Sequence, residues 1–207
     1  MRSSLICAAL LACCAALTAQ APAPTGPMAE MGFNYQLPPE WTVVQTKPQH
    51  RAAAQAPAAT EPRKGNACIQ VALTAQRLDS SSVIVVVDVP FDCFGETMTA
   101  QDLPGLGSGA AEGLKQAFDV LEPVYGAYSL GSHQLWIERA KGSLKGHAET
   151  SYTLEIVCSL LNKGAACWMT MAADADSLRA FETAPVTLDG DPATPLVPST
   201  AFGKGPS

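Results

Sequence analysis

The sequence predicts an exported α+β domain whose strands pair as antiparallel hairpins. Three observations support this prediction. Short apolar or alternating segments, separated by turn residues, are typical of strands. One longer segment repeats its apolar residues at the spacing of a helix. Four cysteines, Cys68, Cys93, Cys158 and Cys167, follow a segment with the features of a secretory leader.

The N-terminal segment, residues 1–19, predicts a signal peptide. Arg2 supplies a positive charge, and Leu5–Leu17 is an uninterrupted apolar run. This run is too short to span a bilayer, which takes about 20 residues. We therefore expect cleavage near Ala19 and a secreted or periplasmic protein without a membrane span.

The same segment has a second interpretation. Leu10-Leu11-Ala12-Cys13 resembles a bacterial lipobox, in which Cys13 would carry the lipid anchor. The protein would then be a membrane-anchored lipoprotein. Both interpretations place the mature chain in a compartment where cysteines form disulfides.

Composition divides the rest of the chain into three parts. Residues 20–32 are rich in proline and alanine and predict a flexible stalk. Residues 33–190 predict a single domain. Within it, Thr46–Ala67 has no apolar period and predicts a low-complexity surface loop. Residues 191–207 predict a disordered tail.

Four strands and a helix are expected in the first half of the domain. The strands are Phe33–Leu37, Trp41–Val44, Cys68–Arg77 and Val83–Val89. Val83–Val87 is apolar at every position, so we expect this strand to be covered on both faces.

The helix is predicted from the spacing of Ala110, Leu114, Phe118 and Leu121, and Pro123 ends it. Gly105–Gly109 precedes it and predicts a flexible entry, with Ser108 as a candidate N-cap. This glycine run lacks the Gly-Lys-Ser/Thr of a phosphate loop, so we expect no nucleotide site.

Three strands, a short helix and a closing strand are expected in the second half. They are Gly131–Arg139, Ser151–Leu161, Ala165–Ala172, the helix Ala175–Thr183, and Val186–Leu188. Asp174 or Asp176 is the expected N-cap of the helix.

The hydrophobic pattern predicts a disulfide between Cys158 and Cys167. When these two residues face each other, Ile156 faces Met169, and apolar residues oppose apolar residues along one face. A slip of one residue would set Ile156 against Thr170, which the pattern disfavours. Directly opposed residues lie within the reach of a disulfide.

A second disulfide is predicted between Cys68 and Cys93. A four-residue loop between Leu78 and Val83 places these cysteines opposite each other, although Pro90 interrupts the ladder before Cys93. Four cysteines permit three pairings, and the other two remain open at this stage.

No motif for catalysis or for a bound cofactor is present. His50, His133 and His147 have no metal-ligand spacing, and no serine lies in a nucleophile elbow. The net charge of −6 makes nucleic acid a poor partner. We therefore expect no catalytic residue, no metal and no cofactor.

The run Phe33-Asn34-Tyr35-Gln36-Leu37-Pro38-Pro39-Glu40-Trp41 resembles the aromatic opening of PsbP-like domains, and Tyr152 to Val186 resembles their closing segment. The resemblance implies an α-β-α sandwich around a largely antiparallel sheet. It also implies a mostly noncatalytic superfamily, although no functional residue maps onto this chain. The loop Thr46–Ala67 and the four cysteines depart from the pattern.

Together these observations predict an exported, disulfide-stapled and noncatalytic binding or accessory protein. Its expected partner is another exported or envelope protein. Two alternatives stay open. A secreted hydrolase would bring His133 or His147 within hydrogen-bond reach of a carboxylate and a serine or threonine. A carrier of a small apolar ligand would have a large cavity between the helix and the sheet.

Overall fold

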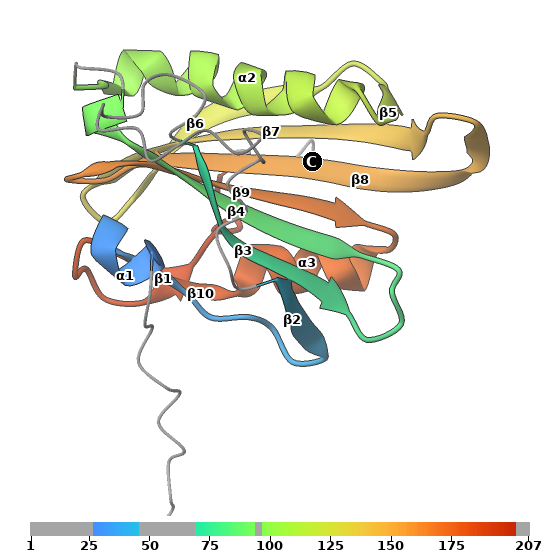
Figure 1. Cartoon of the computed structure of the whole chain (residues 1–207), viewed down its shortest axis with the longest axis horizontal. Coiled ribbons are helices and arrows are strands. Elements are labelled where there is room, and N and C mark those ends of the chain that lie inside the picture. The colour runs from blue at the N-terminus through green and yellow to red at the C-terminus, as the bar shows by residue number, and fades with distance from the viewer. Residues whose placement is uncertain (1–26, 46–68, 94–96, 202–207) are drawn as a thin grey trace, which may run out of the picture.

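The structure is a computed structural model that describes residues 27–45, 69–93 and 97–201. Within these residues, an eight-stranded antiparallel sheet forms the middle layer (Figure 1). Helix α2 (Leu103–Lys115) covers one face of this sheet. Helix α3 (Ala175–Thr183) and a small second sheet lie on the other face. The predicted fold class, a largely antiparallel sheet flanked by helices, is confirmed.

The strand order of the large sheet is β2-β3-β4-β9-β8-β7-β5, and β6 also pairs with β7. The bounds are β2 (Trp41–Gln45), β3 (Gln70–Arg77), β4 (Val83–Pro90), β5 (Phe118–Val120), β6 (Val124–Leu130), β7 (His133–Leu144), β8 (His147–Leu160) and β9 (Gly164–Ala172). The small sheet consists of β1 (Phe33–Tyr35), β10 (Pro185–Leu188) and β11 (Thr194–Pro195). The remaining elements are α1 (Pro27–Met31) and the 3-10 turns η2 (Phe91–Cys93) and η3 (Ala100–Asp102).

The larger hydrophobic cluster lies on the α3 face of the large sheet and joins it to the small sheet. Trp168 of β9 is completely buried there, and its ring meets Phe33 edge-on with 5.2 Å between the ring centres. The Tyr35 hydroxyl donates a hydrogen bond of 3.2 Å to the carbonyl of Phe181 in α3. Phe33 and Tyr35, at the start of the domain, therefore belong to the hydrophobic core and connect the two sheets.

Helix α3 has the predicted bounds, and its start has a clear cause. Asp174 is the N-cap, and its carboxylate accepts a hydrogen bond of 2.7 Å from the Ser177 amide. This bond satisfies one of the amides that a helix start leaves unpaired. Phe181 and Ser177 form the buried side of the helix.

Helix α2 begins and ends earlier than predicted. The capping box of Thr99 and Asp102 starts the helical segment, so Gly105–Gly109 is helical and Ser108 is not the N-cap. Phe118, predicted in the helix, lies in β5, where it pairs with Leu144 and is buried. The helical spacing of Phe118 was misleading because an aromatic residue fits a strand equally well when its neighbours are buried.

The register between β3 and β4 differs from the prediction by two residues. Gln76 pairs with Val83, and the register shifts again between Val71 and Leu73. The turn begins one residue earlier because the Leu78 amide donates to the carbonyl of Glu40, at 2.9 Å, and so leaves the hairpin. Asp79 then accepts hydrogen bonds from the amide and the hydroxyl of Ser81.

The large sheet also contains strands that the pattern does not predict. Strand β6 lies at an edge, with Val124 and Tyr125 60% and 65% exposed, so its residues do not alternate clearly. The connection expected between Arg139 and Ser151 is mostly strand, because β7 continues to Leu144 and β8 begins at His147.

The two ends of the domain extend beyond the predicted bounds. Residues 27–31 form α1 rather than a stalk, and Met31 is buried. Beyond residue 190, Leu196 and Val197 are buried, so the expected tail contributes to the core as far as these residues.

Residues 1–26, with Cys13 and the predicted signal peptide, lie outside the described residues, as do Thr46–Ala67 and residues 202–207. Among the described helices, none has the length and apolar character that crossing a membrane requires.

Candidate functional site

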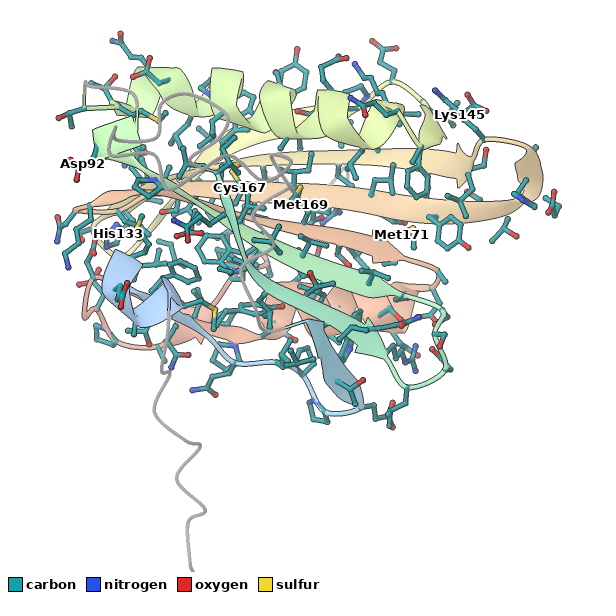
Figure 2. The ribbon with its side chains drawn as sticks, viewed as in Figure 1. Asp92, His133, Lys145, Cys167, Met169 and Met171 are labelled. Atoms are coloured by element: carbon teal, nitrogen blue, oxygen red, sulfur yellow. A yellow bond between two sulfur atoms is a disulfide. The ribbon has the colours of Figure 1, made fainter. Side chains whose placement is uncertain are left out.

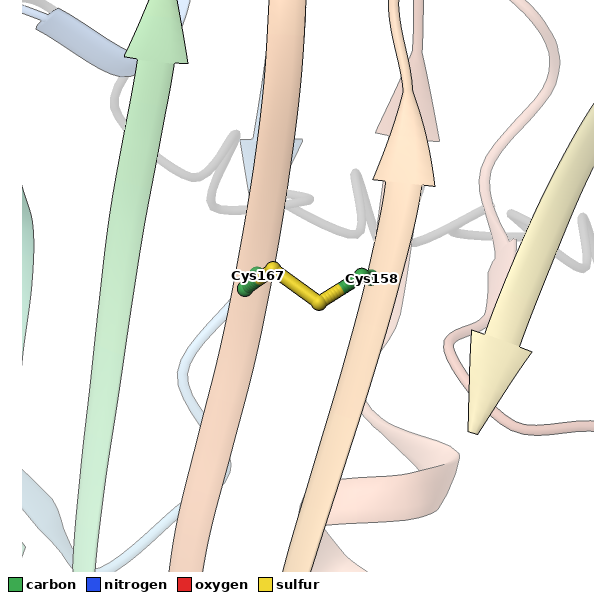
Figure 3. The surroundings of a disulfide bond; sticks show 2 residues. All are labelled: Cys158 and Cys167. Atoms are coloured by element: carbon green, nitrogen blue, oxygen red, sulfur yellow. A yellow bond between two sulfur atoms is a disulfide. The ribbon is translucent and has the colours of Figure 1, made fainter. Parts of the chain in front are cut away.

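The disulfide between Cys158 and Cys167 is present and joins β8 to β9 (Figure 3). The two residues are directly opposed, with 4.1 Å between their Cα atoms, and Ile156 pairs with Met169. The predicted register is therefore confirmed. Both cysteines are buried on the α2 face of the sheet. Cys68 and the side chain of Cys93 lie outside the described part, so their pairing stays a prediction.

His133 does not have the geometry of a catalytic histidine. Its Nε2 lies 3.7 Å from Asp191 Oδ2, beyond a hydrogen bond, and its Nδ1 lies 3.0 Å from the carbonyl of Leu160. The Ser132 hydroxyl donates to the same Asp191 oxygen, at 3.0 Å, instead of to the imidazole. A serine nucleophile needs the opposite order, in which the hydroxyl donates to the histidine.

The other two histidines form no site within the described residues. His147 is exposed and lies 3.3 Å from Glu149, and His50 lies outside the described ranges. Across the part of the chain that the structure describes, no group of three or more histidine, cysteine or acidic residues is placed to hold a metal.

A buried charge cluster connects α3 to the large sheet. Glu155 of β8 is fully buried, and one carboxylate oxygen lies 2.5 Å from Nε of Arg139 on β7. The Arg139 guanidinium also pairs with Glu182 of α3. Burial raises the pKa of Glu155 to about 8, although Arg139 opposes this shift. Because the cluster bridges two packed layers, we assign it to stability.

The feature best suited to binding is a groove of about 690 Å³ between α2 and strands β4 and β9. Its walls are apolar, and its volume lies within the range of about 300–1,000 Å³ that is usual for small-molecule sites. The described residues that line it are Ile69, Val87, Val89, Met98, Asp102, Gly105, Leu106, Gly109, Ala110, Gly113, Leu114, Cys167 and Met169.

The floor of the groove belongs to a longer apolar strip on the sheet. Cys167, Met169 and Met171 follow one another along β9 (Figure 2). They pair with alternate valines of β4, since Val87 faces Cys167 and Val83 faces Met171. The prediction that β4 is covered on both faces is therefore only half correct. Its α3 face is buried, whereas Val83, Val85 and Val87 are only partly buried on the α2 face.

At three positions on the groove side of α2, close packing against described residues does not explain why the residue is glycine. A Cβ atom at Gly105, Gly109 or Gly113 would meet no described atom within 4 Å. Each glycine inside a helix costs about 0.8–1 kcal/mol relative to alanine. The three residues are four apart, so they share one face of the helix, and each of them lines the groove. The absence of side chains at these positions leaves the groove wide, and it lowers the stability of the helix.

Gly107 is different, because it is needed for packing. A Cβ atom there would lie 2.6 Å from Cδ1 of Trp136. We expect Gly107→Ala to lower the free energy of unfolding by about 1–3 kcal/mol through overpacking. Gly113→Ala, in the same helix, should raise it by about 0.5–1 kcal/mol. Denaturant unfolding of the two variants measures both effects, and a Gly107→Ala protein as stable as Gly113→Ala would contradict the described packing.

The glycine spacing is the sequence signal that could have revealed the groove. Gly105, Gly109 and Gly113 stand at intervals of four, which has structural meaning only when the segment is helical. The predicted flexible entry has no helical face, so the glycine spacing has no meaning in that prediction.

Comparison with known proteins finds similarity to solved structures, but none to a known sequence family. The sequence matches no family model and no curated protein. The solution structure of cyanobacterial PsbP from Synechocystis sp. PCC 6803 is similar to this chain, with a TM-score of 0.41 and 13% sequence identity. The match covers 73% of this chain and 79% of that chain. The likeness concerns the fold, and no functional residue is transferred from it.

Proposed function

We propose that the protein is an exported, noncatalytic binding protein and that the groove beneath α2 holds a small apolar ligand. The observation that carries this proposal is the row of Gly105, Gly109 and Gly113 along an apolar groove of about 690 Å³. Helix stability favours alanine at all three positions. An open binding surface accounts for the glycines.

The geometry supports binding better than hydrolysis. The hydroxyl of Ser132 donates to Asp191, and His133 lies beyond hydrogen-bond distance of that carboxylate, so the two residues do not form a nucleophile and base. The groove itself contains one titratable side chain among its described lining residues, Asp102. A single exposed carboxylate does not supply the paired groups of a hydrolase.

Methionines in the groove fit a binding role. Met98 and Met169 line it, and their unbranched thioether side chains adapt to ligands of different shape. The expected partner in the cell, another exported or envelope protein, would then deliver or receive the ligand. This role as an accessory protein requires no chemistry in the groove.

The test is to block the groove with one side chain. N-phenyl-1-naphthylamine, an apolar dye that fluoresces when it is sheltered from water, serves as the probe. We expect the native protein to enhance its fluorescence and Gly109→Leu to reduce the affinity at least tenfold, because the leucine would occupy the groove.

Ser108→Leu is the matched control. Ser108 neighbours Gly109 but lines the opposite side of α2, so the control adds the same apolar side chain outside the groove. It should bind the dye as the native protein does. Equal loss in both variants, or no binding by the native protein, would refute the proposed site.

A further inference from the structure

We infer that the ligand of this groove is an amphiphile with one unbranched aliphatic chain and a cationic head group, and that the head lies at Asp102. The inference deepens the proposed function and rests on it. Three properties of the groove support it: the charge of its lining, the chemistry at the start of α2, and its length.

The charge of the described lining favours a cationic head over an anionic one. Among the described lining residues Asp102 is the one charged side chain, and no lysine, arginine or histidine lies with it. A carboxylate or phosphate head would be repelled by Asp102 and would meet no cation among these residues. A cationic head finds its counter-charge in Asp102.

The start of α2 does not offer an alternative anion site. The first amides of a helix favour negative charge, but here the Asp102 carboxylate stands next to them, bonded to Thr99 and not to the amides of α2. One oxygen of its carboxylate accepts hydrogen bonds from the amide and the hydroxyl of Thr99, at 2.7 and 2.9 Å. These bonds lower the pKa of Asp102 below its ordinary value, so it is ionised at neutral pH. A second anion would be repelled by this carboxylate.

The groove is long and aliphatic. Its helical wall runs from Asp102 to Leu114, which corresponds to about 18 Å at 1.5 Å per residue. On β4 the groove is lined by Val87 and Val89, and the apolar strip continues beyond the groove to Val85 and Val83. No aromatic residue is among the described lining residues, so ring stacking does not contribute. An extended alkyl chain, anchored at one end, matches this shape.

Figure 2 shows the sulfur-containing residues of this strip in order along β9, beneath α2. Cys167 and Met169 line the groove, and Met171 continues the strip beyond it. Because Met169 and Met171 are only partly buried, a chain that leaves the groove still has apolar surface to cover. The head lies at the N-terminal end of α2, and the tail follows the helix toward Leu114.

Three probes with aliphatic chains of eleven or twelve carbons test the head group: dodecyltrimethylammonium, dodecyl maltoside and dodecanoate, each below its micelle concentration. Their affinities are measured by displacement of the naphthylamine dye at low salt. We expect the ammonium probe to bind about tenfold more tightly than dodecanoate, with the uncharged maltoside between them. The ratio should shrink as salt is added, because salt screens exposed charges.

Asp102→Asn and Glu112→Gln remove one negative charge each from opposite sides of α2. Asparagine keeps a side-chain oxygen that accepts the two hydrogen bonds from Thr99, so the first variant should remain folded. We expect Asp102→Asn to reduce the affinity ratio of the ammonium probe to dodecanoate to about twofold or less. Glu112→Gln should leave this ratio unchanged.

The outcomes separate the two proposals. If the native protein binds none of the probes or the dye, the proposed function fails. If it binds all three probes equally, the binding function stands and the inference about the head group is overturned. Equal effects of Asp102→Asn and Glu112→Gln would also overturn it, because the preference would then reflect net charge alone.

Discussion

Trp168→Ala is expected to lower the free energy of unfolding by about 3–5 kcal/mol. Trp168 is completely buried in the cluster that joins the two sheets, and its ring contacts those of Phe33 and Tyr35. Alanine would leave a cavity between the large sheet and β1, and the rigid strands on either side have little freedom to close it.

Urea unfolding followed by circular dichroism measures this loss. Met171→Ala on the same strand is the control, because Met171 is partly exposed on the opposite face. Met171→Ala should lower the free energy of unfolding clearly less than Trp168→Ala does. A cost for Trp168→Ala that is no greater than that of Met171→Ala would show that the described cluster is not the main core.

Arg139→Met is expected to have a similarly large effect, which depends on pH. Burial raises the pKa of Glu155 above its unfolded value, to about 8, while Arg139 acts to lower it. The contribution of Glu155 to stability is therefore present at low pH and is lost as the pH rises through about 8. Without Arg139, ionised Glu155 would face Glu182 with no compensating charge, and breaking such a buried pair costs roughly 3–5 kcal/mol.

The measurement is the free energy of unfolding of the native protein and of Arg139→Met at pH 5 and at pH 9. We expect the difference between the two proteins to be larger at pH 9, where Glu155 ionises. Adding Glu155→Gln to Arg139→Met removes the buried charge and should remove this pH dependence. A difference that is the same at both pH values would contradict the assigned role of Arg139.

The elements that were predicted correctly depend on local rules. The Asp174 cap fixes the start of α3, and the helix has the bounds that its sequence predicts. The register of β8 and β9 follows from apolar residues that oppose one another beside Cys158 and Cys167. In both cases residues close in sequence determine the outcome, so no knowledge of the rest of the fold is needed.

The errors arise where distant residues decide the structure. Leu78 leaves the β3–β4 hairpin because its amide bonds to Glu40, nearly forty residues earlier in the chain. Phe118 joins β5 because Leu144 and Tyr152 offer it a buried place. The groove also depends on distant residues, although the spacing of Gly105, Gly109 and Gly113 is a sequence signal for one of its walls. It exists only when α2 lies across β4 and β9, and the sequence does not specify that placement.

The two faces of the large sheet differ in how completely they are covered. The α3 face holds the sealed aromatic core, whereas the α2 face carries the groove. Substitutions at groove positions such as Met169 and Gly109 leave the aromatic core untouched. If the groove binds a ligand as proposed, its preference can therefore be changed by substitution while the folded architecture beneath it is kept.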